Sequence, residues 1–171
     1  MLWHISIQKQ YRTAKRTFEL NVQFQSNAQR LVLYGPSGAG KTQVLKMLAG
    51  LVKPETGFIH FSNNVLFDSQ QRIHVSPQNR RLAYMFQNYA LFPHLTVAQN
   101  IAFSLQKGWF NPARHLTPPA VANWLEKFDL KALADQYPHQ LSGGQSQRVA
   151  LARALGMSPN ALLLEIGRAH V

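Results

Sequence analysis

The sequence contains no cysteine, few acidic residues and no long apolar segment. The absence of cysteine excludes disulfide bonds, thiolate metal sites and cysteine nucleophiles. No apolar run approaches the ~18 residues that a membrane-spanning helix needs. The amino terminus, Met1-Leu2-Trp3-His4-Ile5, has no basic region leading into an apolar stretch, so a secretory signal is not expected. With 171 residues and 46% apolar composition, we expect one cytoplasmic domain with a buried core.

The scarcity of acidic residues makes the chain strongly basic. Lys and Arg number 18 against 7 Asp and Glu, for a net charge of +11, and no acid occurs between Asp68 and Glu126. Charged residues are only 15% of the chain, so the net charge comes from missing acids. A basic surface without a dedicated partner, an anionic nucleotide and an anionic membrane face are all compatible with this balance. Nucleic acid is not expected, because no basic run carries interleaved aromatic residues.

Hydrophobic periodicity predicts a β-rich first third followed by a helical block. Apolar alternation or short apolar runs indicate strands over 2–7, 18–24, 31–34, 58–61, 65–67, 82–86 and 161–164. Apolar spacing and cap residues indicate helices over 41–49, 96–105, 117–128 and from 142 onward. A helical insertion at roughly 90–140 therefore interrupts an α/β core.

The clearest motif is a phosphate-binding loop. Gly35-Pro36-Ser37-Gly38-Ala39-Gly40-Lys41-Thr42 matches the Walker A pattern in full, between a predicted buried strand and a predicted helix. The glycines let backbone N–H groups converge on phosphate oxygens, and the helix N-terminus adds positive dipole character there. In such a loop the lysine reaches the β- and γ-phosphates and the Thr42 hydroxyl ligates Mg²⁺. The sequence therefore predicts binding of a nucleoside triphosphate.

A second glycine motif occurs about a hundred residues later. Leu141-Ser142-Gly143-Gly144-Gln145 is followed by Gln147-Arg148 and has the spacing of a capping box. A capped helix start of this kind presents a hydroxyl and free N–H groups, which is a second anion site. One chain with one phosphate loop has no obvious use for a second site. Two chains packed head to tail would use it, each completing the other's nucleotide site.

With both motifs, the sequence resembles the ABC transporter ATPases from about residue 2 to Leu164. The resemblance implies an α/β fold: a P-loop NTPase core of the ABC type with an N-terminal antiparallel β subdomain and an inserted helical subdomain, over residues 1–164. It also implies ATP and Mg²⁺ as ligands. Gln87 corresponds to the family's Q-loop glutamine, which contacts Mg²⁺ and the attacking water. Tyr11 lies where the family has an aromatic residue that stacks on adenine, although a packing role fits it equally.

Further segments are similar to the ATPases of bacterial solute importers. They are Pro77 to Arg81 and the run from Phe86 to Val97. The ending Phe67-Asp68 and the loop version Ala39-Gly40-Lys41-Thr42 resemble molybdate importers most. Sulfate, iron and polyamine importers are close alternatives. The family implies a head-to-tail homodimer, transmembrane permease subunits and a peripheral position on the cytoplasmic face of the membrane. Phe92, Pro93 and Leu95 are then expected as partly exposed residues that meet the permease, with packing inside the helical block as the alternative.

The sequence departs from the family after Leu164. Glu165 stands where the Walker B aspartate is expected, and Ile166 stands where the catalytic glutamate is expected. Isoleucine has no lone pair with which to position or deprotonate water, so we expect no ATP turnover from this chain. The residues 165–171 match the translation of GAG ATC GGA AGA GCA CAC GTC, which resembles a sequencing adapter. We therefore expect a non-native tail on a truncated chain, whose parent continues with Asp-Glu-Pro.

Two functions of other classes remain open. A non-transport ABC ATPase that acts on DNA or ribosomes would make use of the net charge of +11 and would bind nucleic acid with a steep salt dependence. The second alternative is a fragment that binds ATP without hydrolysing it. This is what we expect of the 171-residue chain itself.

Overall fold

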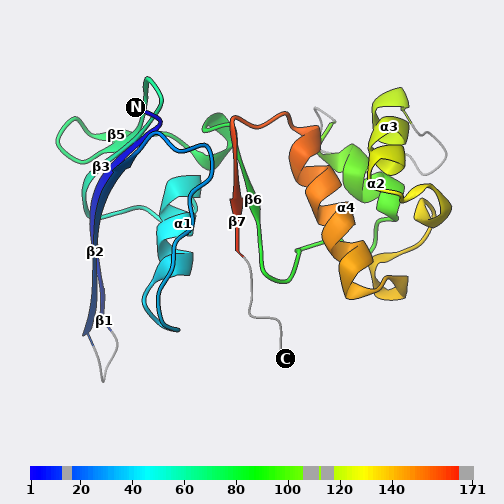
Figure 1. Ribbon diagram of the computed structural model, residues 1–171, viewed down its shortest axis with the longest axis horizontal. Coiled ribbons are helices and arrows are strands. Elements are labelled where there is room, and N and C mark those ends of the chain that lie inside the picture. Colours follow the sequence, from blue (N-terminus) through cyan, green and yellow to red (C-terminus); the bar gives the residue numbers. More distant parts are fainter. Residues whose placement is uncertain (13–16, 106–111, 113–117, 166–171) are drawn as a thin grey trace. The chain divides into compact units, whose positions relative to one another are not determined.

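Two groups of elements, within residues 1–80 and 81–171, make up the computed structural model (Figure 1). It describes residues 1–12, 17–105, 112 and 118–165. Six of the seven residues of the expected non-native tail, and the expected helix start at Thr117, lie outside the described residues. Each group is described by itself.

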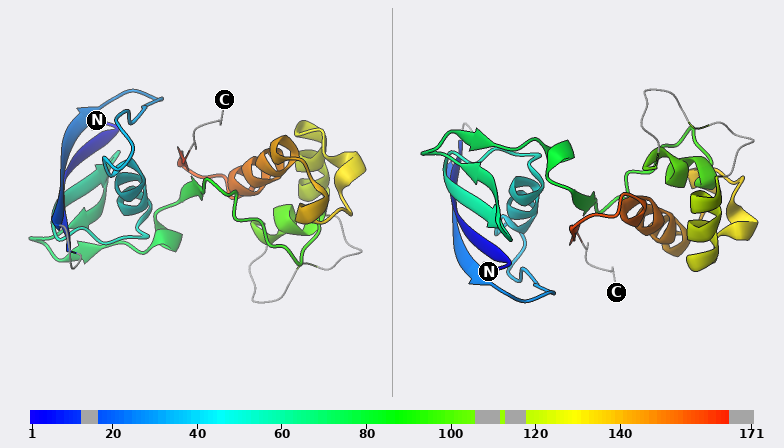
Figure 2. Two further views of the ribbon diagram at one scale, coloured as in Figure 1. Left: turned by 90° about the horizontal axis from the view of Figure 1, so that it is seen from below. Right: turned by 90° about the horizontal axis from the view of Figure 1, so that it is seen from above.

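The first group is an antiparallel sheet with one helix on one of its faces (Figures 1 and 2). Its strands lie in the order β2-β1-β3-β4-β5. The elements are β1 (Trp3–Arg12), β2 (Thr17–Ser26), α1 (Lys41–Ala49), β3 (Thr56–Phe61), β4 (Asn64–Asp68), β5 (Ile73–His74) and the 3-10 turn η1 (Pro77–Asn79).

Alternation along β1 explains how this sheet forms its core. Ile5 and Ile7 are fully buried, and Ile5 pairs across the sheet with Ile59 of β3. Val44 and Met47 of α1 are buried as well, which gives the helix one apolar stripe toward the interior. The predicted antiparallel β subdomain is therefore present, with the helix that begins at Lys41 against it.

The second group combines a parallel strand pair with a helical bundle. β6 (Leu82–Met85) pairs with β7 (Ala161–Leu164), in register from Leu82 opposite Ala161. Helices α2 (Val97–Phe103), α3 (Pro119–Lys127) and α4 (Gly143–Gly156) lie together beside this pair (Figures 1 and 2). The 3-10 turns η2 (Lys131–Leu133) and η3 (Pro138–Gln140) connect α3 to α4. The bundle core includes Val97, Ile101, Val121, Leu125, Leu130 and Val149.

Both capping boxes read from the sequence are formed. Thr96 caps α2 and Ser142 caps α4, each by accepting a hydrogen bond from the backbone N–H three residues later. The side-chain oxygens of Gln99 and Gln145, the residues at those third positions, accept hydrogen bonds from the backbone N–H groups of Thr96 and Ser142. Because each cap satisfies N–H groups that a helix leaves unpaired, the starts of both helices were predictable to within a residue.

The predicted buried strand over 31–34 is wrong. This segment is irregular, and three of its four side chains are exposed, with 85% of Val32 and 97% of Tyr34 accessible to solvent. A β-strand needs a neighbour to pair its N–H and C=O groups, and no described strand is paired with this segment. An apolar run alone does not supply that neighbour.

Among the described residues, no helix has both the length and the apolar character to cross a bilayer.

Candidate functional site

The phosphate loop is a tight turn that leads into α1. Gly38 and Gly40 have φ angles of 82° and 86°, in the left-handed region that favours glycine. A Cβ at Gly40 would overlap the Cδ1 atom of Leu20 on β2. The N–H of Ala39 donates to the carbonyl oxygen of Pro36 at 3.3 Å. The loop is therefore shaped by its glycines and by the close approach of β2.

The side chain of Lys41 is hydrogen-bonded to the phosphate loop. Its ammonium donates to the carbonyl oxygens of Gly35 at 2.8 Å and Pro36 at 2.7 Å. Lys41 and Thr42 begin α1, whose first turn carries no acidic residue. Backbone N–H groups of a first helical turn point out of the helix and carry positive dipole character. This arrangement concentrates positive charge at the loop, as an anionic phosphate requires.

Tyr11 lies next to the start of α1. Its hydroxyl donates to Gln43 Oε1 at 2.8 Å, and its ring is 6.2 Å from that of Phe18. The ammonium of Lys9 lies 5.6 Å from the ring centre. Burial, and then the charge of Glu55, raise the pKa of Tyr11. An aromatic ring is thus close to the phosphate-loop helix, while its use as an adenine platform stays a prediction.

Gln87 and Glu165 lie together because β6 and β7 are parallel. Tyr84 and Leu163 are opposite one another, so both strands end at the same edge. Gln87 and Glu165 line a hollow of about 410 Å³ with Phe86 and Asn88. The N–H of Glu165 donates to the carbonyl oxygen of Met85 at 3.0 Å, which continues the strand pairing by one residue.

The carboxylate of Glu165 also accepts a hydrogen bond from Tyr84. The phenol oxygen and Oε2 are 2.9 Å apart, and burial together with this carboxylate raises the pKa of Tyr84. Carboxylate and amide oxygens are ligands that Mg²⁺ accepts, so the pair Gln87 and Glu165 fits a hard cation. No group of three or more His, Asp or Glu side chains in the described part of the chain is arranged to hold a metal ion alone. A cation here would share its coordination with water or a ligand.

The second glycine motif occupies the start of α4. Ser142 and Gln145 form the capping box, with Gln145 Oε1 accepting from the Ser142 N–H at 2.7 Å. A Cβ at Gly143 or Gly144 would meet no atom within 4 Å, and neither residue has a positive φ angle. The fold therefore does not require glycine at either position. Their open surface leaves room for a group from outside the chain.

The structure groups the predicted site residues into two sets. The loop Gly35 to Thr42 and Tyr11 belong to residues 1–80, while Gln87, Glu165 and the Ser142 motif belong to residues 81–171. Thr42, the other predicted Mg²⁺ ligand, lies in the first set.

One expectation for the partner-facing segment is wrong. Leu95 is only 2% exposed, so its side chain is buried and not partly exposed as a partner contact would require. Phe92 is half-buried and Pro93 is exposed, as expected. The fully buried side chain of Asn100 accounts for this, because it forms hydrogen bonds to the backbone of the segment.

Asn100 is a buried residue that fixes the backbone of this segment and that the sequence reading missed. Its Nδ2 donates to the carbonyl oxygens of Phe92, Leu95 and Thr96 at 3.0–3.2 Å, and its Oδ1 accepts from the Phe92 N–H at 2.9 Å. The only signal in the sequence is an amide placed on the apolar side of a predicted helix, next to Ile101.

Arg153 is a second missed residue. Its Nη2 donates to the carbonyl oxygen of Tyr89 at 3.0 Å, and its guanidinium lies 5.2 Å from the ring centre of Phe92. Tyr89 and Ala90 are consecutive non-glycine residues with positive φ angles, 62° and 43°. Such backbone is strained and persists only where its surroundings hold it. Arg153 thus supports the turn that follows Gln87.

The fold and the site define a P-loop nucleotide-binding protein of the ATP-binding cassette type. The family model for the ABC transporter domain matches residues 19–165, and the chain belongs to this family.

Relatives and solved structures agree with that assignment. The chain is 42% identical over 149 residues to the molybdenum import ATP-binding protein ModC of Mycobacterium tuberculosis, which covers 85% of this chain and 40% of that protein. It is 42% identical over 162 residues to the sulfate/thiosulfate import ATP-binding protein CysA of Caulobacter vibrioides, covering 94% and 46%. The chain thus spans less than half the length of either relative.

A solved structure shows the same fold. The dimeric, post-hydrolysis structure of the ATP-binding cassette MJ0796, bound to ADP and Pi, matches with a TM-score of 0.75 at 28% sequence identity. The match covers 96% of this chain and 73% of that one.

Proposed function

We propose that this chain is the nucleotide-binding part of an ATP-hydrolysing subunit that energises an importer. The observation that carries the proposal is the phosphate loop, whose Lys41 ammonium is fixed by two loop carbonyls at the start of α1. Membership in the ABC transporter family and similarity to two import ATP-binding proteins support it. The subunit would bind at the cytoplasmic face of the membrane as a peripheral protein.

ATP is the proposed nucleotide, held at its phosphates by the loop from Gly35 to Thr42. The loop N–H groups and Lys41 would neutralise the β- and γ-phosphates, and Tyr11 would stack on the adenine. Mg²⁺ supplies charge neutralisation at these phosphates when it is bound. Thr42 and Gln87 are the proposed ligands, and the Glu165 carboxylate beside Gln87 suits the same cation.

The Ser142 motif is proposed to act on a second copy of the chain. Its two glycines are open to solvent and are not needed by the fold, so a phosphate from outside can approach the N-terminus of α4 closely. A head-to-tail homodimer would bring each motif to the other chain's nucleotide. The similar structure of MJ0796 is dimeric, which supports this arrangement. Nucleotide binding would then favour the closed dimer, and hydrolysis would release it.

Molybdate is the proposed solute, with sulfate as the alternative that the relatives support equally and iron or polyamines as further ones. The two relatives, at 42% identity each, carry molybdenum and sulfate/thiosulfate in their names. Permease subunits are the proposed membrane partners, and Pro93 and the exposed part of Phe92 would meet them.

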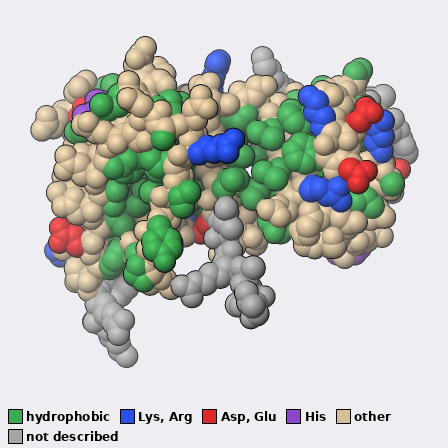
Figure 3. All heavy atoms as spheres, viewed as in Figure 1, with side chains coloured by type: hydrophobic (Ala, Val, Ile, Leu, Met, Phe, Trp, Pro, Cys, Tyr) green, Lys and Arg blue, Asp and Glu red, His purple; other side chains and the backbone are tan. Residues whose placement is uncertain are grey.

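Nucleotide binding tests this function directly. We expect the chain to bind Mg²⁺·ATP in a calorimetric titration and Lys41→Ala to lose most of that affinity. Lys46→Ala is the matched control, since Lys46 lies in the last turn of the same helix, away from the loop. Equal affinity of the wild-type chain and Lys41→Ala, with both folded, would refute the proposal. Nucleic acid is not an expected partner, and binding of the chain to DNA or RNA with a steep salt dependence would favour the non-transport ABC ATPase instead. On the face shown in Figure 3, Lys and Arg side chains are dispersed rather than gathered in one patch.

A further inference from the structure

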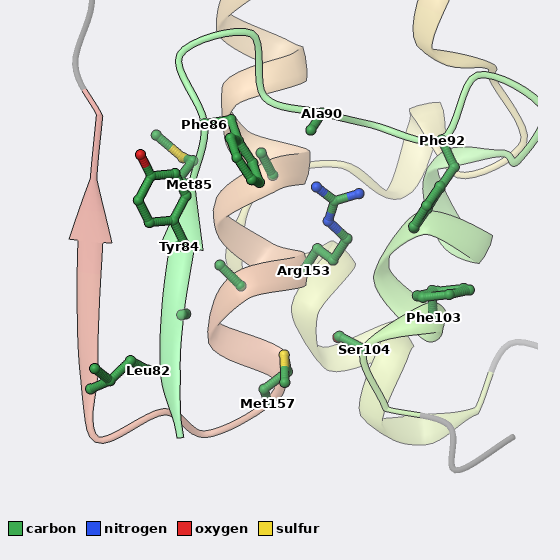
Figure 4. Close-up of a pocket in the computed structure, with 13 residues that line it drawn as sticks. Leu82, Tyr84, Met85, Phe86, Ala90, Phe92, Phe103, Ser104, Arg153 and Met157 are labelled. Atoms are coloured by element: carbon green, nitrogen blue, oxygen red, sulfur yellow. The ribbon is translucent and has the colours of Figure 1, made fainter. Parts of the chain in front are cut away.

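The cavity shown in Figure 4 lies in the second group of elements, between β6, the end of α2 and α4, and has a volume of about 520 Å³. Phe92, which is proposed to meet the permease, is one of the residues that line it. The cavity therefore belongs to the surface already proposed for the membrane partner. In the first group, by contrast, a contact between Tyr11 and Gln43 has no part in the function proposed so far.

The hydroxyl of Tyr11 is bonded to the helix that follows the phosphate loop. It donates to Gln43 Oε1 at 2.8 Å, and the two residues are 32 positions apart in the sequence. Tyr11 lies one residue before the end of β1, and Gln43 is the third residue of α1, two after Lys41. Both side chains are half-buried. The contact therefore joins the end of β1 to the first turn of α1.

Two further contacts restrict the tilt of the Tyr11 ring. Phe18 of β2 lies opposite Tyr11 in the sheet, with the ring centres 6.2 Å apart and the ring planes at 35°. The Lys9 ammonium lies over the ring, 5.6 Å from its centre, and also pairs with Glu55 at 3.8 Å. The χ2 torsion of tyrosine has a broad energy well. A bond at the hydroxyl therefore fixes the long axis of the ring, and neighbours at its faces limit rotation about that axis.

We propose that Gln43 is a positioning residue, which holds the Tyr11 ring where the base of a bound nucleoside triphosphate stacks on it. Gln43 does not touch the base and acts only through the Tyr11 hydroxyl. A ring that is ordered before the nucleotide arrives does not have to be ordered by it, so the base adds more to the affinity. The inference rests on the proposed nucleotide function and assigns one further residue to that site.

Glutamine suits this role because its side-chain carbonyl accepts a hydrogen bond without bringing a negative charge to the phosphate loop. The first turn of α1 has no acidic residue. A carboxylate at residue 43 would accept from Tyr11 equally well, but it would repel phosphates bound two residues away at Lys41. Burial, and then the charge of Glu55, raise the pKa of Tyr11, so the phenol keeps the proton that it donates.

The ratio of the affinity for Mg²⁺·ATP to that for Mg²⁺·tripolyphosphate isolates the contribution of the base, because tripolyphosphate has the phosphates alone. Both ligands are titrated against the whole chain by calorimetry. We expect Gln43→Leu to weaken ATP binding by about three- to tenfold, the effect of one hydrogen bond, and to leave tripolyphosphate binding unchanged. A contact that only stabilised the loop would weaken both ligands alike, since Gln43 lies two residues from Lys41.

Matched variants test the hydrogen bond itself. Tyr11→Phe removes the same bond from the other side, so it should lower the affinity ratio by the same factor, and the double variant with Gln43→Leu should lower it no further. Gln43→Glu keeps an acceptor: its charge should weaken both ligands, while the ratio stays at the wild-type value. Gln25→Leu is the control, because Gln25 is bonded to His4 at 2.8 Å near the opposite end of β2 from Phe18, and its ratio should be unchanged.

The inference is overturned if folded Gln43→Leu keeps the wild-type ratio, or if it weakens tripolyphosphate as much as ATP. Tyr11→Phe keeps the test decisive if Gln43→Leu does not fold, and an unchanged ratio in Tyr11→Phe overturns the inference as well. The failure of the proposed function looks different, because the wild-type chain would then bind neither ligand. ATP binding that is lost in Lys41→Ala but unaffected in Gln43→Leu would uphold that function and remove Gln43 from the site.

Discussion

Arg80 occupies the space that a side chain at Gly50 would need. A Cβ at Gly50 would lie 2.6 Å from the Arg80 Nε, and Gly50 has a φ angle of 82° at the C-terminal end of α1. Arg80 is 2% exposed, and its guanidinium donates to the carbonyl oxygens of Met47 and Leu48, each at 2.8 Å. A buried cation thus satisfies carbonyl groups that the end of a helix leaves unpaired, as such positions favour.

We therefore expect both residues to matter for stability. Arg80→Ala should lower the free energy of unfolding by about 3 kcal/mol, because it strands buried carbonyl groups. Gly50→Ala should lower it by about 1–2 kcal/mol, because alanine is strained at this φ angle and displaces the guanidinium. Urea denaturation measures both. Arg72→Ala, at an exposed position, is the control and should change stability by less than about 0.5 kcal/mol. A loss no larger for Arg80→Ala than for this control would contradict the assignment.

Stability is also expected to depend on pH through His74, which lies beside this guanidinium. His74 Nδ1 lies 3.5 Å from the Arg80 Nη2, and burial, followed by the charges of Arg80 and Lys53, lowers the pKa of His74. The unfolded chain then binds a proton at higher pH than the folded one, so stability is present above about pH 6.5 and is lost as pH falls through the lowered pKa. Urea unfolding on both sides of this pH should show the loss, and His74→Gln should reduce it. An identical pH dependence in the variant would refute the prediction.

Ser142 and Thr96 offer a matched test of the second glycine motif. Both residues cap helices with the same box geometry, so replacing either by alanine should cost about 1 kcal/mol of stability. Only Ser142→Ala is expected to weaken self-association in the presence of Mg²⁺·ATP, because only Ser142 is proposed to meet a second nucleotide. Sedimentation velocity with and without ATP measures the difference. Equal effects of the two variants on dimer formation would refute a role of Ser142 at a second nucleotide and leave it only the role of a helix cap.

Asn100 should control the segment from Phe92 to Thr96. Asn100→Ala removes four hydrogen bonds from a fully buried position, so we expect a loss of about 2–3 kcal/mol. Amide exchange at Phe92 should become faster in the variant by more than the global loss of stability predicts. Asn123→Ala, an exposed asparagine on α3, is the control. Unchanged exchange at Phe92 would show that packing alone holds the segment.

The residues after Leu164 give a prediction about turnover. With Glu165 and Ile166 in place of the family's Asp and Glu, we expect the 171-residue chain to release no more phosphate from ATP than Lys41→Ala does. Sequencing of the gene beyond the Leu164 codon from an independent template should show codons for Asp-Glu-Pro. Turnover clearly above the Lys41→Ala background would mean that another group activates water.

Local signals were sufficient for much of this fold. The capping boxes at Thr96 and Ser142 and the stop at Gly50 fixed helix ends, because each acts through atoms only a few residues apart in the chain. Ile5 and Ile7, two of the apolar residues that indicated the first strand, lie on the buried face of β1 for the same reason. The phosphate loop was legible because its residue types are set by the chemistry of phosphate binding rather than by distant contacts.

Other features depended on which distant groups meet, and the sequence by itself did not determine them. The segment over 31–34 has the composition of a buried strand, yet it is paired with no described strand, and Leu31, Val32 and Tyr34 are exposed. Asn100, Arg80 and Arg153 stabilise the fold because each donates to backbone carbonyls of other segments. One of these carbonyls belongs to Leu95, whose own side chain is buried. A hydrogen-bond partner far away in sequence leaves no periodic pattern. The sequence therefore determined the phosphate loop and the helix caps, whereas tertiary structure decided which polar side chains are buried and which apolar ones remain exposed.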